Sequence, residues 1–353
     1  MRLIVVNYSM SSKSLVFSHQ REVVDALSKF FETVEVFTTE IGSEALAKNV
    51  RVFHIPWKAN SALRNMVAIM KTLYPVLIRN RTSVLFTHMT DVHAAMLAPL
   101  TWLLKMRHIL WYAHAKNSKY LFWSSFFVSK IVSSTPGSCN LYINKRKIIC
   151  INQGIDHKTF PFFGRRFNRL SKIMYYGRLD PSKNIHMFPD LILRLNRSPY
   201  TYSIDVFGRP ANLESEKYFL GIASSLAVNS QETSIIFHDP IARALIPEIA
   251  RKFDIFLNLY TGSLDKTLIE ATFMGMPVIT WNKEYCSQFG TWSDSLVSEN
   301  LNFIIKECES INSMSEVEIH KEINKRLNLA LRIHSFEGWI NRLVGVLKEG
   351  DTP

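Results

Sequence analysis

Short, nearly continuous apolar runs alternate with helix-like segments along both halves of the chain, and this alternation limits the possible folds more than any other feature. In the first half we expect strands at residues 2–7, 34–38, 50–55, 83–88, 108–114, 130–134 and 147–152, with helices such as 18–31 between them. In the second half we expect strands at residues 172–177, 202–208, 234–238, 254–260 and 277–280. Apolar strands separated by helices form parallel sheets covered on both faces. The sequence therefore predicts an α/β fold with two doubly wound, Rossmann-like domains facing across a cleft, and ligands beyond the carboxyl ends of the strands.

The break between the two series of strands lies near residues 152–172, where two glycines and a proline interrupt regular structure. A chain of 353 residues is also long for a single hydrophobic core. We predict an N-terminal domain over residues 1–155 and a C-terminal domain over residues 156–335. The last segment, 336–353, contains most of an amphipathic helix that we expect to pack back toward the N-terminal domain.

Positive charge is concentrated in the first half of the chain. Residues 1–160 contain 20 Lys and Arg against 8 Asp and Glu, whereas residues 161–353 contain 22 of each kind. The net charge of +12 therefore belongs to the first half, which indicates an anionic partner there. A membrane surface, a nucleic acid and a phosphorylated substrate all fit that description.

The remaining composition points to an ordinary cytoplasmic protein. Four cysteines occur without metal or redox spacing, and the opening "MRLIVVNYS" has the pattern of a buried strand rather than of a targeting segment. We therefore expect reduced thiols. No apolar run reaches 18 residues without a charge, so we expect no membrane-spanning segment.

The stretch "YYGRLDPSKN" lies between a predicted strand and the stretch "IHMFPDLILRL", which we expect to form a helix. Gly177 allows close approach of the backbone, and the start of that helix presents free N–H groups. Arg178 and Lys183 add two positive charges to the same turn. The pattern predicts an anion site, and a solvated turn is the alternative.

A second stretch, "NLYTGSLDKTLIEATFMGMPVIT", predicts a strand, a polar loop and a helix that begins after Asp265 and ends before Gly275. Asp265 is a candidate N-cap of that helix. Glu270 falls one turn in, where it can face the same cleft as the "GRLDPSK" loop. Alternatively, Glu270 only complements the helix dipole.

Together these stretches resemble glycosyltransferase family 4, the retaining enzymes with the GT-B fold. "NQGIDHKTF" resembles the join between the two domains, "YYGRLDPSKN" resembles the strand and loop with Gly-Arg-Leu…Lys, and "GSLDKTLIEATFMGMPVIT" resembles the loop and helix with Glu-Ala…Gly-x-Pro-Val. The three occur in family order over about residues 145–285. The resemblance implies transfer of a sugar from a nucleotide-diphosphate sugar to a glycan or lipid-linked acceptor, as in the synthesis of cell-surface polysaccharides or glycolipids.

The resemblance also assigns roles to particular residues. It implies that Arg178 and Lys183 neutralise the donor diphosphate, that Glu270 accepts hydrogen bonds from the ribose hydroxyls, and that His114 faces the transferred sugar. The physics agrees for the diphosphate, because fixed cations stabilise the charge that develops on the leaving group. For His114, a satisfied surface histidine is the alternative. The expected nucleotide-sugar contacts are Gly177, Arg178, Lys183, Ser263, Asp265, Lys266, Thr267, Leu268 and Glu270.

Two positions depart from the family pattern. The family carries a Glu eight positions before Glu270, and this chain has Gly262 there. We interpret this as a different way of holding the sugar, with Asp265 contacting sugar hydroxyls and Lys266 a phosphate, although a solvated loop with a helix cap is the alternative. The first strand is followed by a serine-rich loop in place of a Gly-Gly turn.

Candidate acceptor contacts are Ser11 and Ser12 in that serine-rich loop and His88 after a later strand. No two Asp are two residues apart, so the sequence offers no Asp-x-Asp motif for a metal-bound diphosphate, and no His/Cys cluster has ligand spacing. We therefore expect neither a metal nor another cofactor beside the donor substrate. Retention, with the leaving phosphate oxygen helping to deprotonate the acceptor, is implied by the resemblance alone.

Three basic and aromatic stretches, residues 54–83, 101–114 and 115–130, suggest a surface that lies on an anionic bilayer. A peripheral position on the inner face of the cell membrane follows, unless the apolar residues are core and the cations a solvated face. A sugar-nucleotide epimerase or phosphorylase on the same fold and a catalytically silent partner subunit also remain open. A nucleic-acid-binding protein is disfavoured because the chain has no signature motif for one. The sequence does not name the sugar, the nucleotide base, the acceptor or the oligomeric state.

Overall fold

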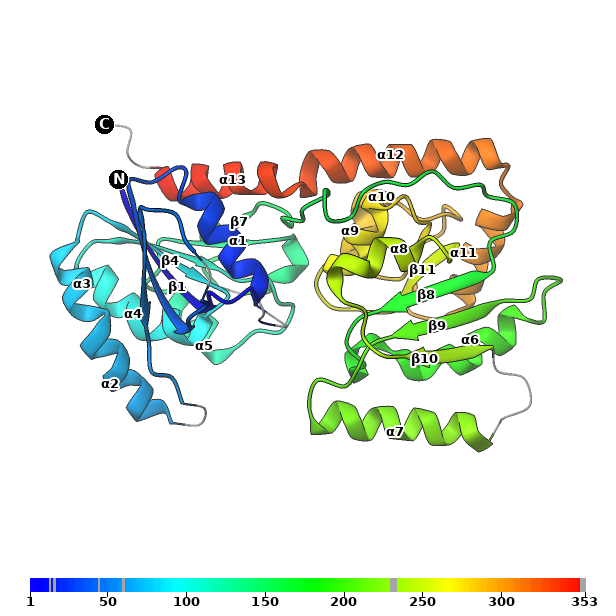
Figure 1. The fold of residues 1–353 in the computed structure, drawn as a ribbon, viewed down its shortest axis with the longest axis horizontal. Helices are drawn as coiled ribbons and strands as arrows, with labels where there is room; N and C mark the ends of the chain where they lie inside the picture. The colour runs from blue at the N-terminus through cyan, green and yellow to red at the C-terminus, as the bar shows by residue number, and fades with distance from the viewer. Residues whose placement is uncertain are drawn as a thin grey trace. The chain divides into compact units, whose positions relative to one another are not determined.

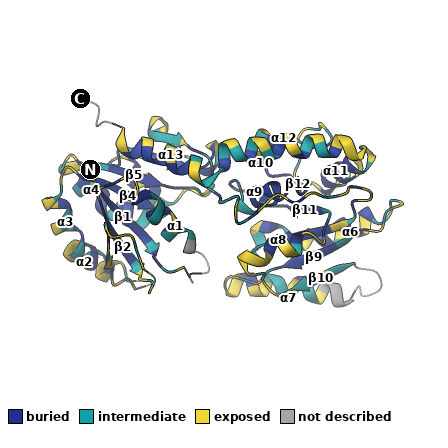
Figure 2. Ribbon diagram, turned by 45° about the horizontal axis from the view of Figure 1, so that its top comes forward, coloured by how far each residue is buried: buried dark blue, intermediate teal, exposed yellow. Residues whose placement is uncertain are grey.

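The computed structural model describes residues 1–349 except 13, 15, 16, 44, 59, 60, 142 and 229–233. The chain forms two compact units, each with its own parallel sheet and flanking helices (Figure 1). Unit 1 consists of Met1–Asn152 together with Glu337–Pro353, and unit 2 consists of Gln153–Phe336. In both units the central strands are buried, whereas the edge strands β3, β7 and β10 are partly exposed (Figure 2).

The sheet of unit 1 has seven parallel strands in the order β3-β2-β1-β4-β5-β6-β7. In the register of the central strands, Val5 lies opposite Val36 on one side and Phe86 on the other. Fully apolar strands of this kind need cover on both faces. The strands are β1 (Arg2–Ser9), β2 (Thr33–Glu40), β3 (Val50–His54), β4 (Val84–His88), β5 (Arg107–Trp111), β6 (Lys130–Ser133) and β7 (Ile148–Cys150).

The helices of unit 1 are α1 (Ser18–Leu27), α2 (Ala62–Thr72), α3 (Tyr74–Arg79), α4 (Asp91–Leu103), α5 (Lys119–Ser125) and α13 (Phe336–Lys348), the last belonging to unit 1 from Glu337 onward. Neighbouring residues of β5 show which helices share a face. Leu110 packs in one core cluster with Leu121 of α5, whereas Trp111 packs edge-on against Trp339 of α13, with ring centroids 5.0 Å apart. Because successive side chains of a strand point to opposite faces, α5 and α13 cover opposite faces of the sheet (Figure 1).

Helices α2, α3 and α4 share the face of α5. Residues of α2, α3 and α4 form one core cluster with the strand residues Ile4 and Val6, and α4 also contributes to the cluster that contains Leu121 of α5. The right-handed crossover rule also predicts that these helices share one face, because the chain moves across the sheet in one direction from β3 through β4 and β5 to β6.

Helix α1 is shorter than the predicted helix over residues 18–31. It ends at Leu27, and residues 28–30 form turns. The Ser28 hydroxyl donates to the Asp25 carbonyl oxygen at 2.7 Å, a local bond that competes with continuation of the helix.

Arginine side chains fasten α13 to unit 1. Arg107 of β5 donates from its two terminal guanidinium nitrogens to the carbonyl oxygens of Leu347 and Val346, at 3.1 and 2.8 Å. Arg342 of α13 donates to the Ile151 carbonyl oxygen at 3.0 Å. The guanidinium of Arg107 thereby satisfies carbonyls at the end of the helix that have no partner within it.

The sheet of unit 2 has five parallel strands in the order β10-β9-β8-β11-β12. Odd-numbered residues of β8 and β11 pack against α6, α7 and α11, and even-numbered residues pack against α8, α9 and α10. The strands are β8 (Lys172–Tyr176), β9 (Ser203–Phe207), β10 (Ile235–His238), β11 (Ile255–Asn258) and β12 (Val278–Thr280). The helices are α6 (Phe188–Leu195), α7 (Leu213–Val228), α8 (Ile246–Ala250), α9 (Lys266–Phe273), α10 (Lys283–Phe289), α11 (Leu301–Ser313) and α12 (Glu316–His334).

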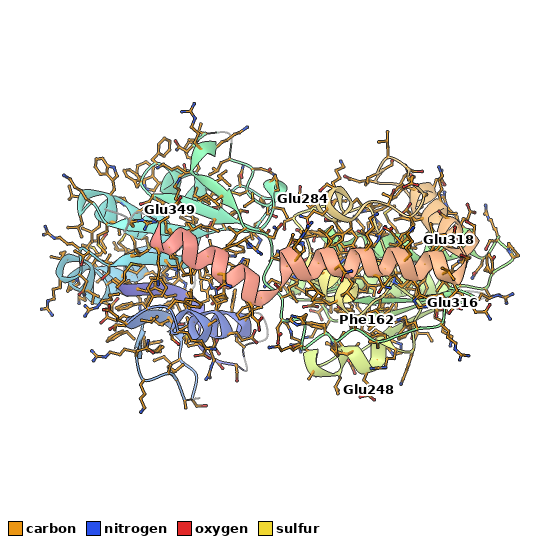
Figure 3. All side chains as sticks on the ribbon, turned by 90° about the horizontal axis from the view of Figure 1, so that it is seen from above. Phe162, Glu248, Glu284, Glu316, Glu318 and Glu349 are labelled. Carbon is orange, nitrogen blue, oxygen red and sulfur yellow. The ribbon has the colours of Figure 1, made fainter. Side chains whose placement is uncertain are left out.

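Helix α12 begins with a capping box in which the Ser315 hydroxyl accepts from the Glu318 N–H and the Glu318 carboxylate accepts from the Ser315 N–H. Glu316 and Glu318 mark this first turn in Figure 3. The sequence analysis did not predict this helix, although Ser315 and Glu318 form the Ser-x-x-Glu pattern of a helix start.

The prediction of two parallel α/β sheets is confirmed, and each predicted strand overlaps an observed one. Most differences are at strand ends. The predicted strand 254–260 ends at Asn258, because the Asn258 side-chain oxygen accepts from the Tyr260 N–H at 2.9 Å and turns the chain out of the ladder.

Candidate functional site

The polar residues singled out in the second half of the sequence gather at the carboxyl ends of β8, β9 and β11. Gly177 follows β8 with a φ of 153°, and its N–H donates to the Phe207 carbonyl oxygen at 3.0 Å. Gly208 follows β9, and a Cβ added there would lie 2.0 Å from the Gly177 carbonyl oxygen. The two loops therefore touch through their backbones, and this contact requires glycine at position 208.

The turn after Gly177 leads to the predicted helix, which begins three residues later than expected. The chain forms two 3₁₀ turns, η3 (Pro181–Lys183) and η4 (Ile185–Met187), before α6 begins at Phe188. Asn184 between the two turns has a left-handed backbone, with a φ of 56°. The first N–H groups of α6 are therefore separated from Gly177 by two short turns, of which the first begins at Pro181 and the second follows Asn184.

Arg178 and Lys183 have different surroundings. Arg178 is exposed, and its carbonyl oxygen accepts from the Tyr175 hydroxyl at 2.8 Å. Lys183 is buried, with its ammonium 2.5 Å from an Asp265 carboxylate oxygen and 3.7 Å from the centroid of the Tyr260 ring. The side chains of Lys183 and Asp265 are only 9% and 15% exposed, so this pair is shielded from water.

Asp265 joins the loop to the start of α9. Its carboxylate accepts from the Asn258 side-chain amide at 3.0 Å and from the Thr267 N–H at 3.3 Å, which confirms the predicted N-cap. Burial alone would raise the pKa of Asp265, but the ammonium of Lys183 and these hydrogen bonds outweigh it and lower the pKa. The alternative of a solvated loop with a helix cap therefore holds for the cap, whereas the Asp265 carboxylate itself is largely shielded from water.

Glu270 is a buried carboxylate on α9. It accepts from the Tyr176 hydroxyl at 3.2 Å and lies 3.4 Å from the guanidinium of Arg243, in the 3₁₀ turn η5 (Arg243–Leu245). Burial raises the pKa of Glu270, and the charges of Arg243 and Lys266 oppose that rise only in part. The side chain thus makes specific contacts beyond any interaction with the helix dipole.

Tyr260 explains why residue 262 is a glycine. A Cβ added to Gly262 would lie 2.1 Å from the Tyr260 hydroxyl oxygen and 2.2 Å from the ring carbon that bears it. The same ring covers the ammonium of Lys183. A glutamate at position 262 and this orientation of Tyr260 are therefore mutually exclusive.

The other residues of the predicted set have mostly backbone or structural contacts. Ser263 is buried, and its carbonyl oxygen accepts from the Asn282 side-chain amide at 3.4 Å. The Thr267 hydroxyl accepts from the amide of Asn258 at 3.0 Å. The Leu268 side chain is fully buried in the core of unit 2, which rules out a side-chain contact with a ligand in this conformation. Lys266 is the first residue of α9.

No protein-family model matches the sequence, and no curated protein matches it. Solved structures do match, along the whole chain. HepE from Anabaena in complex with UDP aligns with a TM-score of 0.74 at 13% identity, over 99% of this chain and 100% of that one. Sucrose-phosphate synthase from Thermosynechococcus elongatus aligns with a TM-score of 0.75 at 11% identity, over 99% and 98%. The trehalose-6-phosphate protein of E. coli bound with UDP-2-fluoro glucose gives 0.74 at 10% identity, over 99% of each chain.

The chain has the GT-B fold. This likeness covers both units and agrees with the predicted fold class. HepE also aligns when solved in complex with UDP-glucose, with a TM-score of 0.70 at 12% identity over 99% of both chains.

The residues predicted to contact the transferred sugar or the acceptor lie in unit 1. His88 ends β4 and is buried, with its ring centroid 6.5 Å from that of Trp111. His114 is exposed, in the loop after β5, with its ring centroid 5.5 Å from that of Tyr112. Ser11 and Ser12 follow β1, and the Ser11 N–H donates to the Ser9 hydroxyl at 3.0 Å. All four residues therefore follow or end strands at the carboxyl edge of the unit 1 sheet.

Sequence reasoning missed four residues that build the site in unit 2. Tyr176, Asn258 and Tyr260 lie within or beside the two quoted stretches, so their position at strand ends was the available signal. Arg243 had no such signal, because it approaches Glu270 from a turn that follows the edge strand β10.

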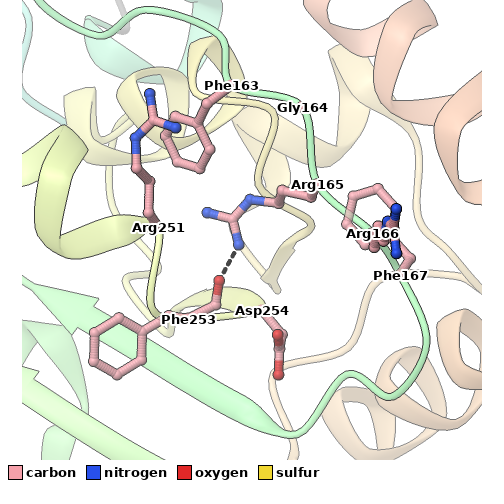
Figure 4. A pocket seen from close by; sticks show the side chains of 8 residues that line it. All are labelled: Phe163, Gly164, Arg165, Arg166, Phe167, Arg251, Phe253 and Asp254. Carbon is pink, nitrogen blue, oxygen red and sulfur yellow. Dashed lines mark hydrogen bonds between the residues drawn. The ribbon is translucent and has the colours of Figure 1, made fainter.

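A separate cavity of about 300 Å³ lies at the other end of the unit 2 strands, near the start of β8 and just before β11 (Figure 4). Arg165 points into it and donates to the carbonyl oxygens of Ala250, at 2.7 Å, and of Phe253. Burial lowers the pKa of Arg165 to about 10. These bonds hold the carboxyl end of α8, so we assign this arginine a structural role. The cavity is lined by Phe163, Gly164, Arg165, Arg166, Phe167, Arg251, Phe253 and Asp254.

Two absences concern the described part of the chain. Within it, no three His, Cys, Asp or Glu side chains are grouped so that they could hold a metal ion. Among the same residues, no helix has the length and apolar character needed to cross a bilayer.

Proposed function

We propose that the chain is a retaining glycosyltransferase that transfers a sugar from a nucleotide-diphosphate sugar, with UDP as the first nucleotide to test. One observation carries the proposal: a buried lysine stands at the carboxyl end of the unit 2 sheet, in a chain whose fold matches structures solved with UDP and UDP-glucose along its whole length. A buried ammonium needs an anionic partner; in this structure Asp265 is that partner, and the diphosphate of a nucleotide is an anion that can compete with its carboxylate for Lys183.

In this proposal Lys183 and Arg178 bind the diphosphate, and Gly177 allows it to approach the backbone. Lys183 contributes a point charge, whereas the exposed guanidinium of Arg178 can bind two phosphate oxygens at once. Glu270 accepts from the ribose hydroxyls. Ser263, in the loop before α9, and Lys266 and Thr267, in the first turn of α9, complete the donor site.

The proposed transfer proceeds with retention. The bond between the anomeric carbon and the phosphate oxygen breaks, and the acceptor oxygen bonds to the anomeric carbon on the same face. The proton of the acceptor hydroxyl passes to the departing phosphate oxygen, which leaves as part of the nucleoside diphosphate. Lys183 and Arg178 stabilise the negative charge that this oxygen gains, so the mechanism asks for no metal ion at the diphosphate.

We assign the sugar and acceptor side of the reaction to unit 1. His114 is proposed to face the transferred sugar, and His88, Ser11 and Ser12 to contact the acceptor. The acceptor is proposed to be a glycan or a lipid-linked glycan of a cell-surface polysaccharide or glycolipid. With such an acceptor, we propose a cytoplasmic location at the inner face of the cell membrane.

Thermal unfolding tests the donor site directly. UDP, GDP, ADP and TDP are each added to the wild type and to the double variant Arg178→Ala, Lys183→Ala. A nucleotide at about 100 times its Kd adds about 2.7 kcal/mol to the unit that binds it, a shift of several degrees. Stabilisation of the wild type alone by one nucleotide supports the proposal and names the base. No shift with any of the four contradicts it.

A catalytically silent partner subunit is the second candidate. It is favoured by Gly262, which stands where the family that this chain resembles carries a glutamate, and by the Tyr260 ring that fills the space of a side chain there. Both candidates bind the nucleotide, so turnover distinguishes them. Release of UDP from UDP-glucose, with and without glycan acceptors, would establish the enzyme. Binding without turnover of any donor sugar would favour the silent subunit.

A further inference from the structure

Unit 1 exposes a group of large apolar side chains at the end of α4 and along α5. Trp102 and Leu103 at the end of α4 are 62% and 70% exposed. On α5, Phe122 and Trp123 are 50% and 52% exposed, and Phe126 follows at the helix end. We call these five residues the α4–α5 patch. A cluster of large exposed apolar side chains usually marks an interaction site, whereas single exposed apolar residues are common on any protein surface.

Ring contacts connect the aromatic side chains of the α4–α5 patch in two groups. The ring of Phe127 lies 6.0 Å from that of Trp102 on α4 and 5.3 Å from that of Trp123 on α5, measured between centroids. Phe122 and Phe126 are in edge contact at 5.4 Å. Phe127 thus joins the end of α4 to α5.

Lys147 brings a basic segment to the same surface. Its ammonium donates to the carbonyl oxygens of Ser125, Phe126 and Val128, at 2.9, 3.0 and 2.8 Å. These bonds fix the 3₁₀ turn η2 (Lys145–Lys147) against the end of α5. The exposed cations near the patch are Lys105, Lys119, Lys145 and Arg146.

The charge of the surrounding sequence is almost entirely positive. Residues 45–155 contain 15 Lys and Arg and a single acidic residue, Asp91. The same sheet face also carries α2 and α3, where Leu63 and Met70 are exposed beside basic residues of those helices. The face of the unit 1 sheet that carries α2, α3, α4 and α5 therefore combines exposed apolar side chains with several exposed basic residues.

We infer that the α4–α5 patch docks on an anionic lipid bilayer. Tryptophan and phenylalanine enter the boundary between headgroups and acyl chains, while lysine and arginine bind the lipid phosphates. A second copy of this chain would meet the patch with the same positive charge. A duplex nucleic acid would bind the cations through its phosphates but leave the apolar side chains in water. The inference goes beyond the proposed sugar transfer and uses only unit 1 residues.

Vesicle co-sedimentation tests the inference with the full chain. The vesicles are phosphatidylcholine alone, or phosphatidylcholine with 30 mol% phosphatidylglycerol, an amount chosen as roughly that of an anionic leaflet. At low salt we expect at least tenfold stronger binding to the anionic vesicles, and a loss of most of that difference in 0.5 M salt because the charges are screened. Equal binding to both vesicles, or binding to neither, overturns the inference.

Two variants locate the binding surface. Trp102→Ser with Trp123→Ser removes apolar contact, and Lys145→Glu with Arg146→Glu reverses charge on exposed residues that are not part of the core. Each should weaken binding to anionic vesicles about tenfold or more, since each basic residue near the surface adds roughly a fivefold factor. Wild-type binding by the charge variant overturns the inference even if the tryptophan variant fails to fold.

Controls distinguish binding through this patch from nonspecific binding through other exposed apolar residues and from any change at the donor site. Leu296→Ser and Val317→Ser in unit 2 alter side chains that are 95% and 77% exposed, and both should bind vesicles like the wild type. Nucleotide-induced thermal stabilisation should be unchanged in the patch variants, so failure of the membrane inference and failure of the proposed function are distinguishable. A concentration-dependent dimer that disappears in the tryptophan variant, without lipid binding, would assign the patch to a second copy and overturn the inference.

Discussion

Replacing Asp265 with asparagine tests the central contact of the unit 2 site. The substitution keeps the shape of the side chain and a good N-cap residue for α9, but it removes the charge that faces Lys183. Breaking a mostly buried ion pair from one side costs about 3–5 kcal/mol. The Tyr260 ring, 3.7 Å from the ammonium, retains about 1–2 kcal/mol of that interaction. We therefore expect Asp265→Asn to lower the free energy of unfolding by about 1–4 kcal/mol.

Urea unfolding at pH 7 measures this loss, followed in the transition that UDP shifts. Asp190→Asn is the matched control, because Asp190 pairs with Arg194 on an exposed helix face and its loss should cost at most about 0.5 kcal/mol. The pKa of Asp265 is lowered from its ordinary 3.8, so its stabilisation is present above that value and is lost as the pH falls through the folded-state pKa. The difference between wild type and variant should hold from pH 7 to about pH 4 and shrink below.

The same variant should be less stable than the wild type but should bind the nucleotide more tightly. In the wild type, the donor diphosphate must compete with the Asp265 carboxylate for Lys183, whereas in Asp265→Asn it does not. Titration calorimetry should therefore show at least tenfold tighter UDP binding, about 1.4 kcal/mol or more. Equal stability of wild type and variant at pH 7 would refute the ion-pair reasoning. Weaker UDP binding would instead make Asp265 a ligand contact.

Three further predictions concern unit 2. Gly262→Ala should cost about 1–3 kcal/mol on urea unfolding, because its Cβ displaces the Tyr260 ring, and Tyr260→Ala in the same chain should remove most of that extra cost. Gly208→Ala should cost about 3 kcal/mol or more and weaken UDP binding, because its Cβ meets the Gly177 backbone and not a movable side chain; an unchanged melting temperature would contradict this. Burial raises the pKa of Glu270, so its contribution to stability is complete below pH 4.5 and is lost as the pH rises through the folded-state pKa. The melting temperature of Glu270→Gln, which cannot ionise, should therefore rise relative to that of the wild type between pH 4 and pH 8, as melting curves of both proteins would show.

The sequence was sufficient for the fold because two buried parallel sheets leave a strong periodic signal. Apolar strands such as residues 2–7 can only be buried on both faces, and the fold matches bear out the two doubly wound units. The Asp265 cap was also predictable, since capping is local. Contacts that close over long sequence distances were not predictable, as with Arg243 reaching Glu270 and Asp265 meeting Lys183. Residue type alone could not show that Tyr260 fills the space beside Gly262.

Unit 1 is assembled from two separated pieces of the chain, residues 1–152 and the segment from Glu337. Protein synthesis delivers these pieces in order, so the 184 residues of unit 2 must emerge before α13 is available. At usual elongation rates this takes about 10–40 s. During that time Trp111 and Arg107 have no α13 to bind, and the contiguous unit 2 can complete its own fold first. Until α13 emerges, nascent unit 1 therefore leaves the part of its sheet around Trp111 uncovered and accessible to chaperones.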